Sequence, residues 1–273
     1  MPLTESLSEV IDGRVVAIEV GKTIDRFVIR GLADADDARQ QFEVMKGAVL
    51  AASLQIGGGV RVRHDLVIVD DATKPPSDPS LPIAFSEGRS LSGIMLGVGQ
   101  VSFQTEKVLP AFLAALRFGF SSTQLRLALR DERVALAGVL YVDSYYETSV
   151  QAQFLSLVGV LEVLKDQAPR SAAALDMIGR WRSEVKALED HEAQAIRGTL
   201  KDMTTISIGQ GIRSVVRRHL GEESAREAKI LYELRSELIH TGTTSADLNE
   251  ARRRAARFAN SLLMRILMAG GVG

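Results

Sequence analysis

The sequence predicts an α+β protein in which an N-terminal module of strands and one helix precedes an all-helical bundle. Two observations support this fold class. In the first part of the chain, short runs rich in valine and isoleucine alternate with glycine- and proline-rich turn signals, which is typical of strands. From Thr105 onward, apolar residues recur about every 3.6 residues in nearly every segment, which indicates helices. We therefore expect two domains, at residues 1–104 and 105–273.

The N-terminal module is expected to begin with two strands, at residues 14–20 and 24–30, joined by a tight turn at 21–23. A helix is expected at 34–56, because apolar side chains recur at helical spacing and aspartates lie at its start, where acids suit the helix dipole. A glycine triplet ends it. A further strand is expected at residues 60–69 and a proline-rich exposed loop at 70–82, followed by two or three short strands at 83–85, 92–98 and 100–103.

The second half is expected to consist of helices at residues 105–118, 122–130, 132–146, 151–165, 172–188, 189–203, 205–220, 223–240 and 247–268. The helix at 151–165 is apolar almost all round, so we expect it at the centre of the bundle. Its one acid is Glu162. A carboxylate on such a helix is seldom left unpaired, so we expect it to face a partner such as an arginine or to reach the edge of the bundle.

Composition limits the classes of function. The chain has 33 basic and 34 acidic residues and a net charge of -1, so any contact with nucleic acid must come from a local patch. It has no cysteine, which excludes disulfides, thiolate metal sites and a cysteine nucleophile. No two histidines share helical i, i+4 spacing, so we expect neither a zinc site of that type nor a cofactor. No apolar run is long enough to cross a bilayer and the N-terminus has no signal-like pattern, so we expect a cytoplasmic protein without membrane partners.

One helix end carries the clearest pattern in the chain. Leucines recur at three- and four-residue steps from Leu231 to Leu238 and form an apolar stripe along the predicted helix. Arg235 lies beside this stripe, where its guanidinium is expected to find a packed partner. His240 closes the helix, and Gly242 suits its C-terminus. An arginine and a titratable histidine are thereby placed on the end of one helix.

This helix end resembles the HEPN superfamily, and most closely its Apea-like branch. The resemblance lies in Arg235 followed after four residues by His240, with Tyr232 before them and a Thr-Gly dipeptide after them. It covers roughly residues 130–268 and says nothing about the N-terminal module. It implies an all-α bundle of HEPN type. In many members of the family the arginine and histidine form a metal-independent ribonuclease site in a cleft shared by two subunits.

The resemblance also implies supporting residues. Glu162 stands where a glutamate is common in the first helix of Apea-like domains, either as a structural partner or as support for the site. Tyr232 belongs to the quoted pattern. Ser236 follows the arginine, where serine is usual in this branch, and lies one turn before His240. It either orients the histidine ring or is a surface serine without a role.

RNA chemistry explains why this residue pair is suited to cleavage without a metal. The 2′-hydroxyl lies next to the scissile phosphate, so the reaction needs only a proton acceptor, a proton donor and a cation. His240 is expected to transfer protons and Arg235 to contact phosphate oxygens. One histidine does not easily act on both sides of an in-line displacement, so two facing copies are expected. The predicted products carry a 2′,3′-cyclic phosphate and a 5′-hydroxyl, and DNA is not expected to be cut.

Two alternatives stay open from the sequence. Arg213 and His219 form a second pair at similar spacing, although their flanks read as an ordinary basic helix end. The three consecutive arginines Arg252, Arg253 and Arg254 cover three faces of a helix, so they either form salt bridges and meet solvent or contact the RNA backbone.

For function, we expect a dimeric endoribonuclease of a defence or toxin-like system, regulated by the N-terminal module. The alternative is a catalytically inactive HEPN scaffold that binds a nucleotide, RNA or a protein partner.

Overall fold

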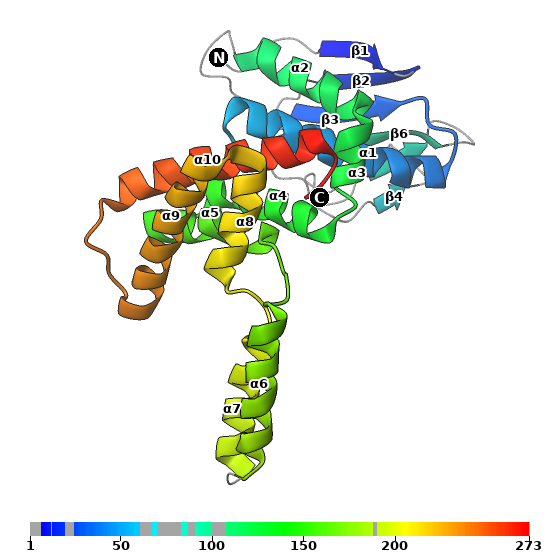
Figure 1. Ribbon diagram of the computed structural model, residues 1–273. Helices are drawn as coiled ribbons and strands as arrows, with labels where there is room; N and C mark the ends of the chain where they lie inside the picture. The colour runs from blue at the N-terminus through cyan, green and yellow to red at the C-terminus, as the bar shows by residue number, and fades with distance from the viewer. Residues whose placement is uncertain are drawn as a thin grey trace.

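The computed structural model confirms the α+β class: strands and one long helix are followed by a helical bundle (Figure 1). It describes residues 7–11, 13–19, 25–60, 67–69, 83–86, 91–99, 108–187 and 190–272. Three expected features lie outside the described residues, namely the turn at 21–23, the loop at 70–82 and the strand at 100–103.

Six described strands form one sheet with the order β1-β2-β3-β6-β5-β4. Their bounds are β1 Leu7–Ile11, β2 Arg14–Glu19, β3 Asp25–Arg30, β4 Val67–Val69, β5 Ile83–Ser86 and β6 Leu91–Gly99. Neighbours are antiparallel except β4 and β5, which are parallel. β1 was not expected from the sequence. It forms an edge hairpin with β2, and Gly13 in the intervening turn has φ of 78°, a conformation that favours glycine.

Helix α1 (Ala35–Ile56) begins and ends where the sequence indicates. The side chain of Asp34 accepts hydrogen bonds from the main-chain N–H groups of Asp36 and Asp37, at 3.0 and 2.8 Å. This capping satisfies donors that the first helical turn leaves free. At the other end, Gly57 adopts the left-handed conformation with φ of 63°, which only glycine takes without strain.

Nine further α-helices are described after the sheet, and two short 3-10 turns follow α4 and α6. The α-helices are α2 Val108–Ser121, α3 Thr123–Ala128, α4 Glu132–Asp143, α5 Val150–Leu164, α6 Ala172–Glu184, α7 Asp190–Asp202, α8 Ile208–Leu220, α9 Glu222–Thr241 and α10 Leu248–Ala269. Helix α5 packs against α4, α8, α9 and α10, so the expected central position of this apolar helix is confirmed.

Two hydrophobic clusters meet at α1. We call the first the N-terminal cluster; it joins β3, one face of α1 and the buried side of α2, which includes Phe112 and Phe120. We call the second the bundle cluster; it joins α3, α4, α5, α8, α9 and α10 and includes Ala51 and Leu54 of α1. Because α1 contributes to both clusters, its two faces connect the sheet to the bundle.

A group of polar contacts holds the C-terminal end of α1 against the bundle. Asn260 of α10 donates one hydrogen bond to the carbonyl of Leu54 at 2.6 Å and another to the hydroxyl of Tyr141 at 2.9 Å. Tyr145 donates to the carbonyl of Gly57 at 2.7 Å. Partial burial raises the pKa of Tyr145, and its hydrogen bond with Tyr141 raises it further. We call these contacts the tyrosine latch.

Helices α6 and α7 form a hairpin that projects away from the rest of the protein (Figure 1). Its own buried residues are Ile178, Val185, Ala193 and Leu200. Trp181 is 39% exposed on its surface. None of the described helices combines the length and apolar character that crossing a bilayer requires.

Candidate functional site

Helix α9 carries the predicted Arg235 and His240. It starts after Gly221, which has φ of 88°, and ends at Gly242, which has φ of 75° and whose N–H bonds to the carbonyl of Leu238. Leu231 and Leu238 are buried in the bundle cluster, so the leucine stripe fixes the rotation of the helix about its axis. The two candidate side chains leave α9 next to this anchored face.

Arg235 forms an ion pair with Glu162 of α5. Its Nε lies 2.8 Å from Oε1 without hydrogen-bond geometry, and Nη2 donates to Oε2 at 3.3 Å. The side chains of Arg235 and Glu162 are 30% and 21% exposed, so the pair lies at the edge of the bundle. The arginine partner expected for Glu162 is therefore confirmed, and it is one of the predicted site residues.

The contact leaves most of the guanidinium available. An arginine has five N–H donors, and only one of those of Arg235 makes a hydrogen bond to another described residue. Glu162 thus holds the guanidinium in place without saturating it. A cation that is fixed and still has free planar donors is suited to phosphate oxygens.

His240 is exposed in the last turn of α9 and forms no hydrogen bond or ion pair within the part of the chain that the structure describes. It follows Arg235 by five residues, which turns its side chain about 140° around the helix and moves it about 7.5 Å along the axis. The two side chains therefore leave α9 in different directions.

The supporting residues differ in their surroundings. Tyr232 is half-buried against the bundle cluster, and a Cβ added to Gly209 of α8 would meet its ring at 3.3 Å. Its role in the structure is packing between α8 and α9. Ser236 is half-buried one turn before His240, and no hydrogen bond joins the two among the described residues. The structure therefore does not bring Ser236 onto the histidine ring.

Both side chains of the competing pair on α8, Arg213 and His219, contact main-chain carbonyls. His219 Nε2 lies 3.0 Å from the carbonyl oxygen of Val272, and the neighbouring Arg218 donates to the same carbonyl at 2.7 Å. Arg213 donates to the carbonyl of Gly209, one turn earlier in its own helix, at 3.3 Å. His219 thus holds the C-terminal segment, whereas His240 is free to meet a ligand. This contrast favours the pair on α9.

The arginine run on α10 is partly neutralised. Arg253 pairs with Glu250 at 2.8 Å, and Arg254 pairs with Glu227 of α9 at 3.0 Å. Arg252 is half-buried and has no carboxylate partner among the described residues. The expectation that at least one of the three forms a salt bridge is confirmed, and contact with RNA through them stays a prediction.

No group of three histidine, aspartate or glutamate side chains within the described ranges is placed to hold a metal ion. A further candidate site was not expected from the sequence: a groove between α1, α3 and α4 with Arg126 in its lining. Two glycines of the sequence, Gly47 and Gly138, lie in this groove. Because glycine has no side chain, Leu129 approaches Gly47 closely and Leu50 approaches Gly138 closely. Glycine alone does not reveal a groove, because helices that are far apart in the sequence form it.

Comparison with known proteins found no match to a family model, to a curated protein or to a solved structure.

Proposed function

We propose that the protein is a metal-independent endoribonuclease of HEPN type that acts as a dimer, with the N-terminal module sensing a trigger or restraining the activity in a defence or toxin-like system. The observation that carries this proposal is the presence of two side chains near the end of α9: an arginine fixed by Glu162 and an exposed histidine that has no partner among the described residues. The resemblance of the same residues to the Apea-like branch supports it.

The proposed chemistry assigns one role to each side chain. His240 removes the proton from the 2′-hydroxyl, whose oxygen then forms a bond to phosphorus as the bond to the 5′-oxygen breaks. Arg235 offsets the charge that develops on the non-bridging phosphate oxygens. The departing 5′-oxygen takes a proton from a second imidazole. The products are a 2′,3′-cyclic phosphate and a 5′-hydroxyl, with no water consumed in this step.

The direction of the side chains supports a dimer. Arg235 and His240 of one chain diverge by about 140° around α9. A second copy facing the first supplies an arginine and a histidine from the opposite side, so that both imidazoles reach one phosphodiester. Glu162 acts in this proposal as a positioning residue, because it touches the arginine and not the substrate.

The test uses a labelled single-stranded RNA in excess EDTA. Wild type is expected to cleave it, while His240→Ala and Arg235→Ala are expected to lose at least about 100-fold in rate. His219→Ala is the matched control: this half-buried histidine near the end of α8 contacts a main-chain carbonyl, and its removal should leave cleavage within a few-fold of wild type. A 2′-deoxy substitution at the cleavage position should block the reaction. Equal cleavage by wild type and His240→Ala would remove the enzyme proposal.

The dimer is tested separately from the chemistry. Light scattering measures the mass in solution, and the cleavage rate per chain is followed as the protein is diluted. We expect the rate per chain to fall as the dimer dissociates. A rate per chain that stays constant in samples shown to be monomeric would contradict the shared cleft.

A second candidate is a HEPN scaffold without activity that binds RNA, a nucleotide or a protein. The observations that favour it are the ion pair that already engages Arg235 and the absence of a Ser236–His240 contact among the described residues. Absence of cleavage in several buffers, together with a gel shift of the same RNA that Arg235→Ala weakens, would support this candidate over the nuclease.

A further inference from the structure

The groove between α1, α3 and α4 has a volume of about 690 Å³, within the range of cavities that hold small organic ligands. Its apolar walls come from one face of each long helix: Val44, Gly47 and Leu50 of α1, and Ala135, Val139 and Val142 of α4. These positions recur at three- and four-residue steps, so both faces run along the groove. The lining is mainly apolar, and the groove lies where the N-terminal cluster and the bundle cluster meet.

The charged residues of the groove leave one cation in excess. Three cations, Lys46, Arg126 and Arg130, line it together with two carboxylates, Glu43 and Asp143. Lys46 and Glu43 neutralise each other at 2.7 Å. The described residues of the lining therefore carry a net charge of +1, and a ligand with one negative charge complements them.

Arg126 is the cation best placed to receive that charge. Its Nη1 donates to the carbonyl of Phe120 at 2.9 Å and its Nη2 to the hydroxyl of Thr123 at 3.2 Å. Both acceptors are neutral, and no carboxylate pairs with Arg126 among the described residues. Three of its five N–H donors stay open. A half-buried guanidinium without a counter-ion gains most from an anion, because it is partly removed from water.

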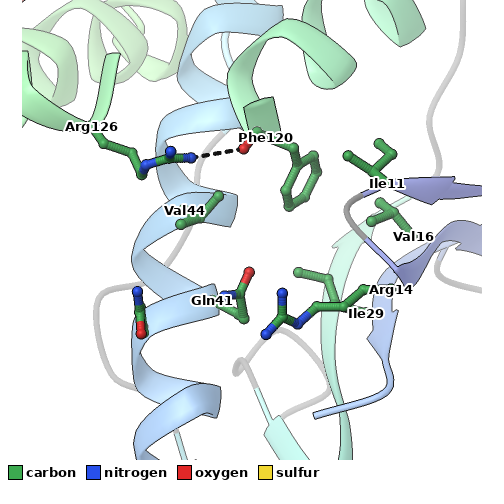
Figure 2. Close-up of a pocket in the computed structure, with 9 residues that line it drawn as sticks. Ile11, Arg14, Val16, Ile29, Gln41, Val44, Phe120 and Arg126 are labelled. Carbon is green, nitrogen blue, oxygen red and sulfur yellow. Dashed lines mark hydrogen bonds between the residues drawn. The ribbon is translucent and has the colours of Figure 1, made fainter. Parts of the chain in front are cut away.

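A smaller cavity also has Arg126 in its lining. Figure 2 shows this cavity of about 230 Å³, in which Arg126, Val44 and Arg14 come from different elements. Gln40, Val44 and Arg126 line both cavities. Arg14 pairs with Asp37 at 2.9 Å, yet its Nε is buried without a hydrogen-bond partner. The two cavities thus share Arg126, and the smaller one has a second arginine, Arg14, in its lining.

We propose that the groove binds a small molecule with an apolar body and a single carboxylate. The carboxylate meets the open donors of Arg126, whose planar fork matches two carboxylate oxygens. The body lies between the apolar faces of α1 and α4. A dianionic phosphate would exceed the net charge of the lining, and an ammonium would repel Arg126. This site is independent of the proposed ribonuclease, since none of its residues belongs to α5 or α9.

The test measures binding to the full chain by isothermal titration calorimetry with three probes of equal chain length: decanoate, 1-decanol and decylammonium. Wild type is expected to bind decanoate at least about 10-fold more tightly than 1-decanol, as a charge-assisted hydrogen bond predicts. Decylammonium should bind more weakly than either. Absence of decanoate binding, or equal affinity for decanoate and 1-decanol, would overturn the proposal.

Two pairs of variants locate the site. Arg126→Gln should lower the affinity for decanoate about 10-fold and leave the affinity for 1-decanol within about two-fold. Arg39→Gln is its control, because Arg39 is an exposed arginine of α1 paired with Asp36, and it should change neither affinity. Ala135→Phe should fill the groove and abolish binding of both probes. Leu136→Phe is its control, because Leu136 is 49% exposed on the same helix and does not line the groove.

The outcomes of these variants are distinct. Unchanged decanoate binding in a folded Ala135→Phe protein places the ligand elsewhere and refutes the assignment. Circular dichroism verifies folding, and if Ala135→Phe does not fold, the comparison of Arg126→Gln with Arg39→Gln decides. An equal loss of decanoate and 1-decanol in Arg126→Gln would refute the contact between the carboxylate and Arg126.

Discussion

Removing one partner of the Glu162–Arg235 ion pair is expected to destabilise the bundle measurably. The side chains are 21% and 30% exposed, and Oε1 of Glu162 is enclosed without a hydrogen-bond partner. Breaking a buried pair from one side costs about 3–5 kcal/mol, whereas exposed pairs contribute about 0–1 kcal/mol. The intermediate exposure places the cost of Arg235→Gln at about 1–3 kcal/mol of unfolding free energy.

A double-mutant cycle isolates the pair from other effects of the substitutions. Urea unfolding followed by circular dichroism gives the free energies for Arg235→Gln, Glu162→Gln and the double variant. We expect the double variant to lose less than the two single losses together, by about 1 kcal/mol. The control is the exposed pair of Lys229 and Glu233 on the same helix, with an expected coupling of at most about 0.5 kcal/mol. A coupling for Glu162 and Arg235 no larger than this control would refute the reasoning.

Two further predictions concern stability. A Cβ at Gly119 would lie 2.3 Å from Cα of Ala48, so Gly119→Ala should lower the unfolding free energy by about 1–3 kcal/mol. A Cβ at Gly179 meets nothing within 4 Å, so Gly179→Ala should raise the unfolding free energy by about 0.5–1 kcal/mol. Thermal unfolding measures both variants, and a change of the same sign in both would contradict this. Burial alone would raise the pKa of Asp37, but a main-chain N–H and Arg14 hold it below its ordinary 3.8. Asp37 therefore stabilises the fold above about pH 4, and this contribution is lost as the pH falls through the lowered pKa. The stability gap between wild type and Asp37→Asn in urea titrations should shrink from about pH 7 to about pH 2.5, and a constant gap would disprove it.

Helix positions were largely readable from the sequence, because local signals fix them. Asp34 and Gly57 bound α1, and Gly242 ends α9, as expected from capping chemistry. The apolar character of residues 151–165 also predicted the central helix α5 and a partner for its acid. The identity of that partner, Arg235, was not readable, since the two residues are 73 positions apart and no local rule connects them.

Features that form by pairing between distant segments were not predicted from the sequence. β1 is a short edge strand stabilised by β2, and its five residues alone carry too weak an alternation to be recognised. Helix α2 was expected within the helical half, yet Phe112 and Phe120 pack in the N-terminal cluster. The boundary at residue 104 stays a prediction. The groove arises only once α1 lies against α4, and so composition and periodicity do not show it.

The tyrosine latch attaches the C-terminal end of α1 to the helical bundle. One end of this helix is packed under the sheet, and the other is fastened to α10 through Asn260 and Leu54. Closely packed interiors transmit displacement with little compression. A displacement of the end of α1 that packs on the sheet is therefore expected to reach Asn260 at the other end of the helix.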